Sequence, residues 1–244
     1  MSSNKLTVPS LWKKTSVKQL LIGLVVAVIL VIGTQYSSTQ SPTQVADDST
    51  LNLASPPVSP AGDALKTLAI KGRAPKTNYS RQQFGDGWNV VSGCDMRERI
   101  LQRDLTSVQL DRDNCTVLGG TLHDPYTDKT IAFARGPDTS SAVQIDHVVA
   151  LSDAWQTGAQ QLTATARNQL ANDPLELLAV DGPTNQAKGN GDAATWLPAN
   201  KGFRCAYVAR QITVKVKYHL WVTRVEYDAM RGVLEGCPGQ NLVQ

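Results

Sequence analysis

Apolar positions are concentrated in two stretches of the chain. The first has the pattern of a strand, and the second has the pattern of a strand followed by a helix. Residues 144–151 (QIDHVVAL) combine apolar side chains with one charged pair, which predicts a short strand. Residues 175–181 (LELLAVD) predict a second strand, and the turn after it leads into a helix. Pro183 favours a helix start there, because its missing N–H is not needed in the first turn of a helix.

Apolar spacing and capping residues predict six more helices and one hairpin, so the expected fold class is α+β. The hairpin comprises residues 116–121 and 130–134, and His123 in the turn-rich segment between them is interpreted as a turn residue rather than a metal ligand. Glycines and aromatic side chains in residues 79–88 predict an irregular packed loop. The predicted helices are 63–70 with Asp63 as N-cap, 95–105, 152–157 with Ser152 as N-cap, 160–170, 203–220 and 223–234, the last opened by a Thr223–Glu226 capping box.

Basic side chains on two of these helices are interpreted as solvent-exposed. Arg97, Arg99 and Arg103 cannot all face the core, because residues two apart on a helix point in different directions. Lys215 and Lys217 are interpreted in the same way, with contact to a phosphate backbone as the minority alternative.

The N-terminal part of the chain has a different pattern. An apolar run from Leu20 to Gly33 follows four lysines, and no acidic residue precedes Asp47, which predicts an exported chain with its N-terminus inside. The run is shorter than the ~20 residues that span a bilayer, so a cleaved signal and a retained anchor both remain open. The predicted organisation is a membrane anchor or signal segment over residues 1–36, with membrane contact through 18–36, then a disordered Ser/Thr/Pro-rich linker over 37–62 and a folded domain over 63–244.

The net charge of +3 gives no argument for nucleic-acid binding. The lysines that precede the apolar run are four of the 24 basic residues, and the remaining 20 face 21 acidic ones, so the rest of the chain is close to neutral. Only local clustering of charge could indicate a nucleic-acid partner.

All four cysteines lie after the apolar run, and an even number in an exported chain predicts disulfides. Three pairings are possible. The sequential pairing, Cys94–Cys115 and Cys205–Cys237, would link a helix to the hairpin and join the last two helices. A four-cysteine zinc site is the rival interpretation, although the chain has no CxxC pair.

Asp146, His147 and Asn185 are the candidate functional residues carried by the two stretches. Carboxylate and amide oxygens are ligands that Mg²⁺ prefers, so Asp146 and Asn185 are candidate ligands of one cation. Side chains alternate along a strand, so His147 is expected on the face opposite Asp146, and an imidazole titrates near neutral pH, as a general base requires. A histidine of the core bonded to backbone is the alternative interpretation of His147 taken alone.

Four motifs together resemble a known family. Residues 146–155 (DHVVALSDAW), 171–180 (ANDPLELLAV), 185–189 (NQAKG) and 196–198 (WLP) are similar to the bacterial HNH (ββα-metal) endonucleases. Among them the chain most resembles exported HNH family proteins whose domain is related to the C-terminal part of GmrSD-type restriction enzymes. The resemblance spans about residues 79–237 and implies a ββα-metal core with surrounding helices and a helical insertion between the two strands.

The resemblance also implies supporting residues. Glu176 stands where these enzymes usually carry an Asn that braces the loop after the first strand, with Asn172 nearby; Glu176 would brace differently or approach the metal. Lys188 is expected to contact substrate phosphate or to pair with Asp192. Arg97 is the expected phosphate contact on its helix.

The function that follows is a metal-dependent phosphodiesterase that cleaves DNA, with RNA as the alternative substrate, outside the cytoplasmic membrane. One divalent cation is expected, Mg²⁺ first with Mn²⁺ or Zn²⁺ as alternatives, and His147 is the expected general base. The runner-up is a non-catalytic, membrane-tethered nucleic-acid-binding module on the same fold, and a cell-wall or structural domain is the third class. Sequence alone cannot reveal an inhibitor protein or any other protein partner.

Overall fold

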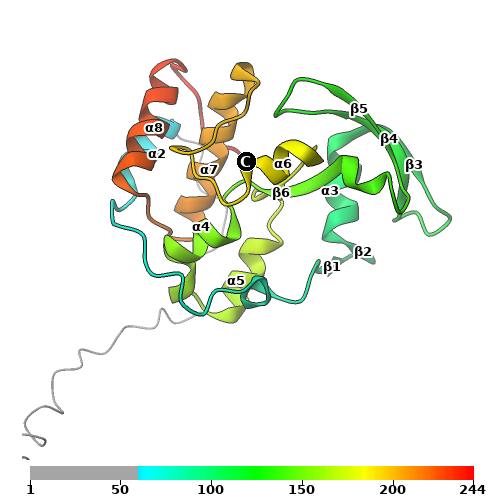
Figure 1. Ribbon diagram of the computed structural model, residues 1–244, viewed down its shortest axis with the longest axis horizontal. Coiled ribbons are helices and arrows are strands. Elements are labelled where there is room, and N and C mark those ends of the chain that lie inside the picture. Colours follow the sequence, from blue (N-terminus) through cyan, green and yellow to red (C-terminus); the bar gives the residue numbers. More distant parts are fainter. Residues whose placement is uncertain (1–59) are drawn as a thin grey trace, which may run out of the picture. The chain divides into compact units, whose positions relative to one another are not determined.

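The computed structural model describes residues 60–244 (Figure 1). The predicted N-terminal segment (1–36) and all but the last residues of the predicted linker (37–62) lie outside them. No helix within this described part is both long enough and apolar enough to span a membrane.

Helices and short strands alternate along this part of the chain. The helices are α2 (Ala61–Thr67), α3 (Met96–Asp104), α4 (Leu151–Gln156), α5 (Ala164–Ala171), α6 (Gly182–Lys188), α7 (Arg204–Lys217) and α8 (Arg224–Glu235). The strands are β1 (Val90–Val91), β2 (Cys94–Asp95), β3 (Leu105–Leu110), β4 (Val117–His123), β5 (Thr130–Ala134), β6 (Val143–His147) and β7 (Leu177–Asp181). Single 3₁₀ turns are η2 (Arg81–Phe84), η3 (Ser140–Ala142), η4 (Ala159–Gln161) and η5 (Lys201–Phe203). The α+β class is therefore confirmed.

Strands β6 and β7 and helix α6 form an antiparallel strand pair followed directly by a helix. The register runs from Val143 opposite Asp181 to His147 opposite Leu177. The side chain of Asp181 caps α6 by accepting from the Thr184 N–H at 2.8 Å, which fixes the tight strand-to-helix turn. Helices α4 and α5 lie between the two strands in sequence, as the resemblance implied.

A three-stranded sheet, β3–β4–β5, stands on the other side of α3 from the helices α2, α7 and α8 (Figure 1). The predicted hairpin is its β4–β5 pair, and His123 is the exposed last residue of β4. Strand β3 was not predicted. Helix α3 ends at Asp104 and the chain becomes extended at Leu105, which packs so closely on β4 that a Cβ at Gly120 would lie 2.9 Å from Leu105 Cδ2.

Strand β7 separates two hydrophobic cores. Leu177 and Ala179 pack with α3 and the three-stranded sheet, whereas Leu178 and Val180 pack with the helices of the larger core. Because side chains alternate along a strand, one short strand contributes to both cores and is held from both faces. All four side chains are at most 8% exposed, so the β6–β7 pair is a rigid support for what it carries.

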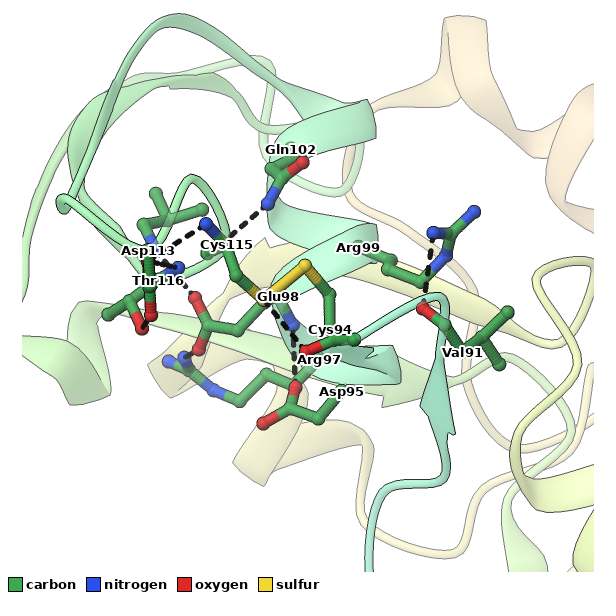
Figure 2. Close-up of a disulfide and its surroundings, with 12 residues drawn as sticks. Val91, Cys94, Asp95, Arg97, Glu98, Arg99, Gln102, Asp113, Cys115 and Thr116 are labelled. Atoms are coloured by element: carbon green, nitrogen blue, oxygen red, sulfur yellow. Dashed lines mark hydrogen bonds and ion pairs between the residues drawn. A yellow bond between two sulfur atoms is a disulfide. The ribbon is translucent and has the colours of Figure 1, made fainter.

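The two disulfides have the sequential pairing, Cys94–Cys115 and Cys205–Cys237, which confirms that prediction. Figure 2 shows the first, which links the strand before α3 to the turn between β3 and β4. Gln102 of α3 reinforces the link by donating to the Cys115 carbonyl at 2.6 Å. Each disulfide closes a modest loop, which stabilises a fold by about 3 kcal/mol in chain-entropy terms.

Lys215 corrects a prediction, because it is buried rather than solvated. Its side chain is 0% exposed, and Nζ lies 3.3 Å from Asp153 Oδ2 and 2.9 Å from Glu226 Oε1. Arg73 joins the same cluster through Asp153, at 2.7 Å. Lys217 is also paired, with Asp173 at 2.7 Å. The helix spacing did place these lysines on α7, but α8 and the loop before it cover the face that carries Lys215.

Other boundaries differ by small shifts. Helix α2 begins at Ala61 after Pro60, so Asp63 lies inside its first turn and pairs with Lys66 instead of capping. Helix α4 has no side-chain cap, so Ser152 does not cap it. The predicted helix 160–170 consists of η4 and then α5, and Thr163 caps α5 through the Ala166 N–H. The capping box of α8 is confirmed.

Replacing Lys215 tests how much this buried cluster stabilises the fold. In Lys215→Ala, the carboxylates of Asp153 and Glu226 lose their buried cation, and we expect the free energy of unfolding to fall by about 3–5 kcal/mol. Denaturant unfolding measures the loss. The control is Arg231→Ala, which removes an exposed pair with Glu235 and should change stability by less than about 1 kcal/mol. Equal effects of the two variants would contradict this assignment.

Candidate functional site

A polar cavity of about 170 Å³ lies where β6 ends, beside helix α6. Asp146 and His147, the last residues of β6, and Asn185 of α6 all line it. Tyr79 and Arg81 close it from the segment that precedes the domain's first strand. The three candidate residues thus line one cavity. His147 and Asp146 lie on opposite faces of β6, as strand alternation predicts. His147 stacks on Trp88, which packs on the smaller core, whereas Asp146 accepts from Tyr126 of the larger core.

Asp146 is buried and has two partners behind the cavity. Lys188, whose side chain is 0% exposed, places Nζ 2.9 Å from Oδ1 and 2.8 Å from Oδ2, and it also donates to the His147 carbonyl at 2.6 Å. The hydroxyl of Tyr126 donates to Oδ2. A carboxylate has about four acceptor positions, and these donors fill two on Oδ2 and one on Oδ1. One acceptor position on Oδ1 remains.

Asn185 is the second oxygen donor at the cavity. Its Nδ2 donates to Gln144 Oε1 at 3.0 Å, which orients the amide and leaves Oδ1 as an acceptor. Together with Asp146 Oδ1 this gives a carboxylate and an amide oxygen at the edge of a polar cavity. That donor set fits Mg²⁺, which binds through few protein oxygens and keeps water or phosphate in its remaining positions.

His147 is held by contacts on one ring nitrogen and one ring face. Nε2 lies 3.0 Å from the Ala171 carbonyl, and the ring stacks on Trp88 with the centroids 5.8 Å apart and the planes 8° from parallel. A carbonyl only accepts, so Nε2 carries the proton and Nδ1 carries the lone pair of the neutral ring. Burial, with the nearby charge of Arg81, lowers the pKa of His147 to about 3, so the ring is neutral at pH 7.

Glu176 braces the loop that follows β6. Its Oε2 accepts from the Val149 N–H at 3.2 Å and its backbone carbonyl accepts from the Val148 N–H at 2.9 Å. The side chain is 0% exposed and does not line the cavity. Burial is the main cause that raises the pKa of Glu176 well above its usual value. Of the two roles considered for Glu176, its contacts fit bracing.

The other supporting residues lie away from the cavity. Asn172 accepts from the Asn89 N–H at 2.8 Å and so fastens the segment that carries Trp88. Asp192 pairs with Arg73 at 2.7 Å. Lys188 pairs with Asp146 instead of Asp192, and its buried side chain does not line the cavity. Arg97 lies 3.0 Å from Glu98 Oε1 and over the ring of Phe133, outside the cavity.

Sequence reasoning missed three residues at the site: Tyr126, Trp88 and Arg81. Tyr126 stands in the segment DPYT, which also matches the resembled family but was assigned no functional role from the sequence. Trp88 and Arg81 lie in the loop that was predicted to be packed and structural. Each reaches the site through a tertiary contact, so no local pattern in the sequence announced it. The three aromatic residues of that loop, Tyr79, Phe84 and Trp88, were the one available signal.

A buried cluster of three carboxylates, Asp153, Asp192 and Glu226, lies apart from these residues. Lys215 and Arg73 contribute two positive charges to it, at 2.7–3.3 Å from the carboxylate oxygens. Ion pairs within the protein therefore explain the cluster.

The fold and cavity define an α+β, disulfide-linked domain whose strand–strand–helix unit presents a carboxylate, an imidazole and an amide to one cavity. Comparison with known proteins gives the family. Residues 95–233 match the family described as GmrSD restriction endonucleases, C-terminal domain, and the chain belongs to it. This family indicates a nuclease, a hydrolase with a nucleic-acid substrate.

One curated relative extends the similarity. The chain is 38% identical over 185 residues, covering 75% of this chain and 87% of the relative, to an "Uncharacterized secreted protein" of Arthroderma benhamiae. No solved structure matches. The relative is fungal, so the similarity is not confined to bacteria.

Glu176→Gln tests the brace through the pH dependence of stability. A carboxyl whose pKa is raised by folding destabilises the fold as pH rises from its unfolded pKa, near 4.5, toward the folded one. Gln is isosteric with the protonated acid and does not titrate. We therefore expect the variant to gain free energy of unfolding relative to wild type between pH 5 and pH 8, measured by denaturant unfolding. If the difference in free energy of unfolding between variant and wild type does not change with pH, the raised pKa of Glu176 would be contradicted.

Proposed function

We propose that this protein is a metal-dependent phosphodiesterase, an HNH-type endonuclease that cleaves DNA, with RNA as the alternative substrate. The observation that carries the proposal is the meeting of Asp146, His147 and Asn185 at one polar cavity, with His147 Nδ1 left as the acceptor of a neutral ring. Membership of a restriction endonuclease family supports the reaction class. The strand–strand–helix unit supports the ββα-metal assignment.

Asp146 and Asn185 would hold one divalent cation, Mg²⁺ in the first place and Mn²⁺ or Zn²⁺ as alternatives. Such a cation, when bound, neutralises the phosphoryl oxygens and the leaving 3′ oxygen as a Lewis acid. Lys188 already compensates the charge of Asp146, so these two ligands give a site of low charge. We therefore expect weak cation affinity unless a substrate phosphate contributes its own oxygens.

His147 acts as the general base in this proposal. Nδ1 takes the proton from the attacking water, while the Nε2 contact to Ala171 and the stack on Trp88 keep the ring in one orientation. Burial keeps the ring in the neutral form that can accept a proton, but the lowered pKa makes His147 a weaker base than the near-neutral imidazole expected from the sequence. The brace from Glu176 fixes the loop directly after His147, which limits movement of the base. Attack in line with the 3′ oxygen would leave a 5′-phosphate and a 3′-hydroxyl.

The proposed location is outside the cytoplasm. Two disulfides are typical of exported proteins, and the fungal relative is described as a secreted protein. Whether the chain keeps a membrane anchor through residues 18–36 or loses it by cleavage stays a prediction, as does an inhibitor protein.

One observation favours the second candidate, a nucleic-acid-binding module without catalysis. Lys188 and Tyr126 fill three of the four acceptor positions of Asp146, which is the arrangement of a structural carboxylate as well. In such a protein the cavity would bind phosphate without cutting the chain.

Plasmid cleavage by three variants separates the two functions. We expect wild-type protein to nick plasmid DNA in the presence of Mg²⁺ or Mn²⁺, and we expect cleavage to stop when EDTA is added. His147→Ala, which removes the base, should lower the cleavage rate by about 10²–10⁴-fold. Asn185→Ala should raise the Mg²⁺ concentration needed for half-maximal cleavage.

His123→Ala is the matched control, because it removes an exposed imidazole from the end of β4 and should cut at the wild-type rate. Cleavage that persists in EDTA, or cleavage by His147→Ala at the wild-type rate, would contradict the proposed mechanism. Binding of plasmid without any cutting would favour the non-catalytic module.

A further inference from the structure

Arg81 is the one positively charged residue, among the described residues, that lines the cavity shared by Asp146, His147 and Asn185. It also lines a second, smaller cavity of about 120 Å³, together with His147 and Trp88. Arg81 therefore contributes to both of the cavities that His147 lines. Its side chain is exposed, whereas that of Lys188, the other cation at the site, is buried.

The backbone of Arg81 is fixed, although its side chain is exposed. Arg81 begins η2, which ends at the buried Phe84, packed edge-on against Trp155 at 6.3 Å. Arg167 donates to the Gln83 carbonyl at 2.7 Å and holds the middle of the same turn. The guanidinium itself has no hydrogen bond or ion pair within residues 60–244. Because the backbone of Arg81 is held and its guanidinium is unpaired, the guanidinium is available to a ligand.

Charge balance at the cavity makes Arg81 decisive for an anionic ligand. Asp146 is compensated at 2.8 Å by Lys188, so this pair contributes no net charge. Arg97, which was expected to bind phosphate, is paired with Glu98 and lies elsewhere. The attraction of the cavity for an anion therefore rests on the guanidinium of Arg81. A guanidinium can contact two phosphate oxygens at once through parallel N–H groups.

We infer that Arg81 binds the non-bridging oxygens of the scissile phosphodiester and places its phosphorus between His147 and the oxygens of Asp146 and Asn185. The inference rests on the proposed function and names a substrate-binding residue for it. Arg81 lies outside residues 95–233, so the match to the family does not include it. As negative charge grows on the phosphoryl oxygens during attack, the guanidinium stabilises the transition state more than the ground state.

Kinetics of three variants of the full chain test the inference on a fluorescein-labelled DNA duplex with Mg²⁺. Arg81→Ala should lower kcat/KM by about 10²-fold, with a fall in kcat as well as a rise in KM. Arg81→Lys keeps the charge without the two-oxygen contact and should recover part of the loss. The control is Arg112→Ala, in the turn between β3 and β4, which removes an equally exposed guanidinium and should stay within about twofold of wild type. Unfolding midpoints should be unchanged, since Arg81 has no partner to lose.

A binding measurement keeps this test separate from the test of catalysis. In EDTA and on a His147→Ala background, we measure the affinity for the same duplex as a function of salt concentration. Loss of Arg81 should reduce the slope of log K against log salt by about one, as the loss of one phosphate contact does. If wild-type protein does not cut DNA, the proposed function fails and the scissile contact with it, and this slope then decides only whether Arg81 contacts a phosphate of the bound duplex.

Two outcomes overturn the inference while cleavage stands. Wild-type kcat/KM in Arg81→Ala would show that the guanidinium is not needed at the scissile phosphate. A changed salt slope with unchanged kcat would show that Arg81 contacts a flanking phosphate instead. Absence of both cutting and salt-dependent binding would reject the inference together with the proposed function.

Discussion

The buried ion pair between Asp146 and Lys188 is the interaction on which the candidate site depends. It joins the end of β6 to the end of α6, and the same Lys188 ammonium donates to the His147 carbonyl, so one side chain fixes the backbone of both residues. A buried charge without its partner costs several kcal/mol, so the strand and the helix cannot separate cheaply. This constraint sets the rotation of α6 that brings Asn185 to the cavity. The positions of the site residues are therefore fixed by a buried ion pair that solvent does not reach.

The surrounding structure extends that rigidity. Strand β7 is held by a hydrophobic core on each face, and β6 pairs with it along its whole length. Glu176, directly before β7, accepts from the Val149 N–H and so ties the loop after His147 to the neighbouring strand. The imidazole consequently has a fixed ring plane, one occupied nitrogen and one free nitrogen. Preorganisation of this kind lets a small cavity position a base without help from a moving loop.

Local sequence patterns predicted the parts of the fold that local interactions determine. Asp181 and Pro183 specify the strand-to-helix turn because a cap and a fixed φ act within a few residues, and the Thr223–Glu226 box acts in the same way. Lys215 could not be predicted, since its partner Asp153 is 62 residues away and its helical spacing resembles that of an exposed lysine. Lys188 was placed one turn from Asn185, but whether it faces Asp192 or Asp146 depends on how α6 packs. Strand β3 was missed because it follows a helix without a break, and its pairing with β4 is a tertiary contact.

The segment between α2 and α3 completes the site although it precedes the residues matched by the family. Arg73 anchors its start through Asp153 and Asp192, and the Asn89 N–H anchors its end on Asn172. Between these anchors the chain supplies both the Trp88 ring that stacks on His147 and the Arg81 side chain that lines the cavity. The core of strands and helix thus provides the ligands and the base, while this segment provides the orientation of the base and the unpaired positive charge. Because Asp146 is already neutralised, the segment decides the sign of the charge that the cavity presents to a substrate.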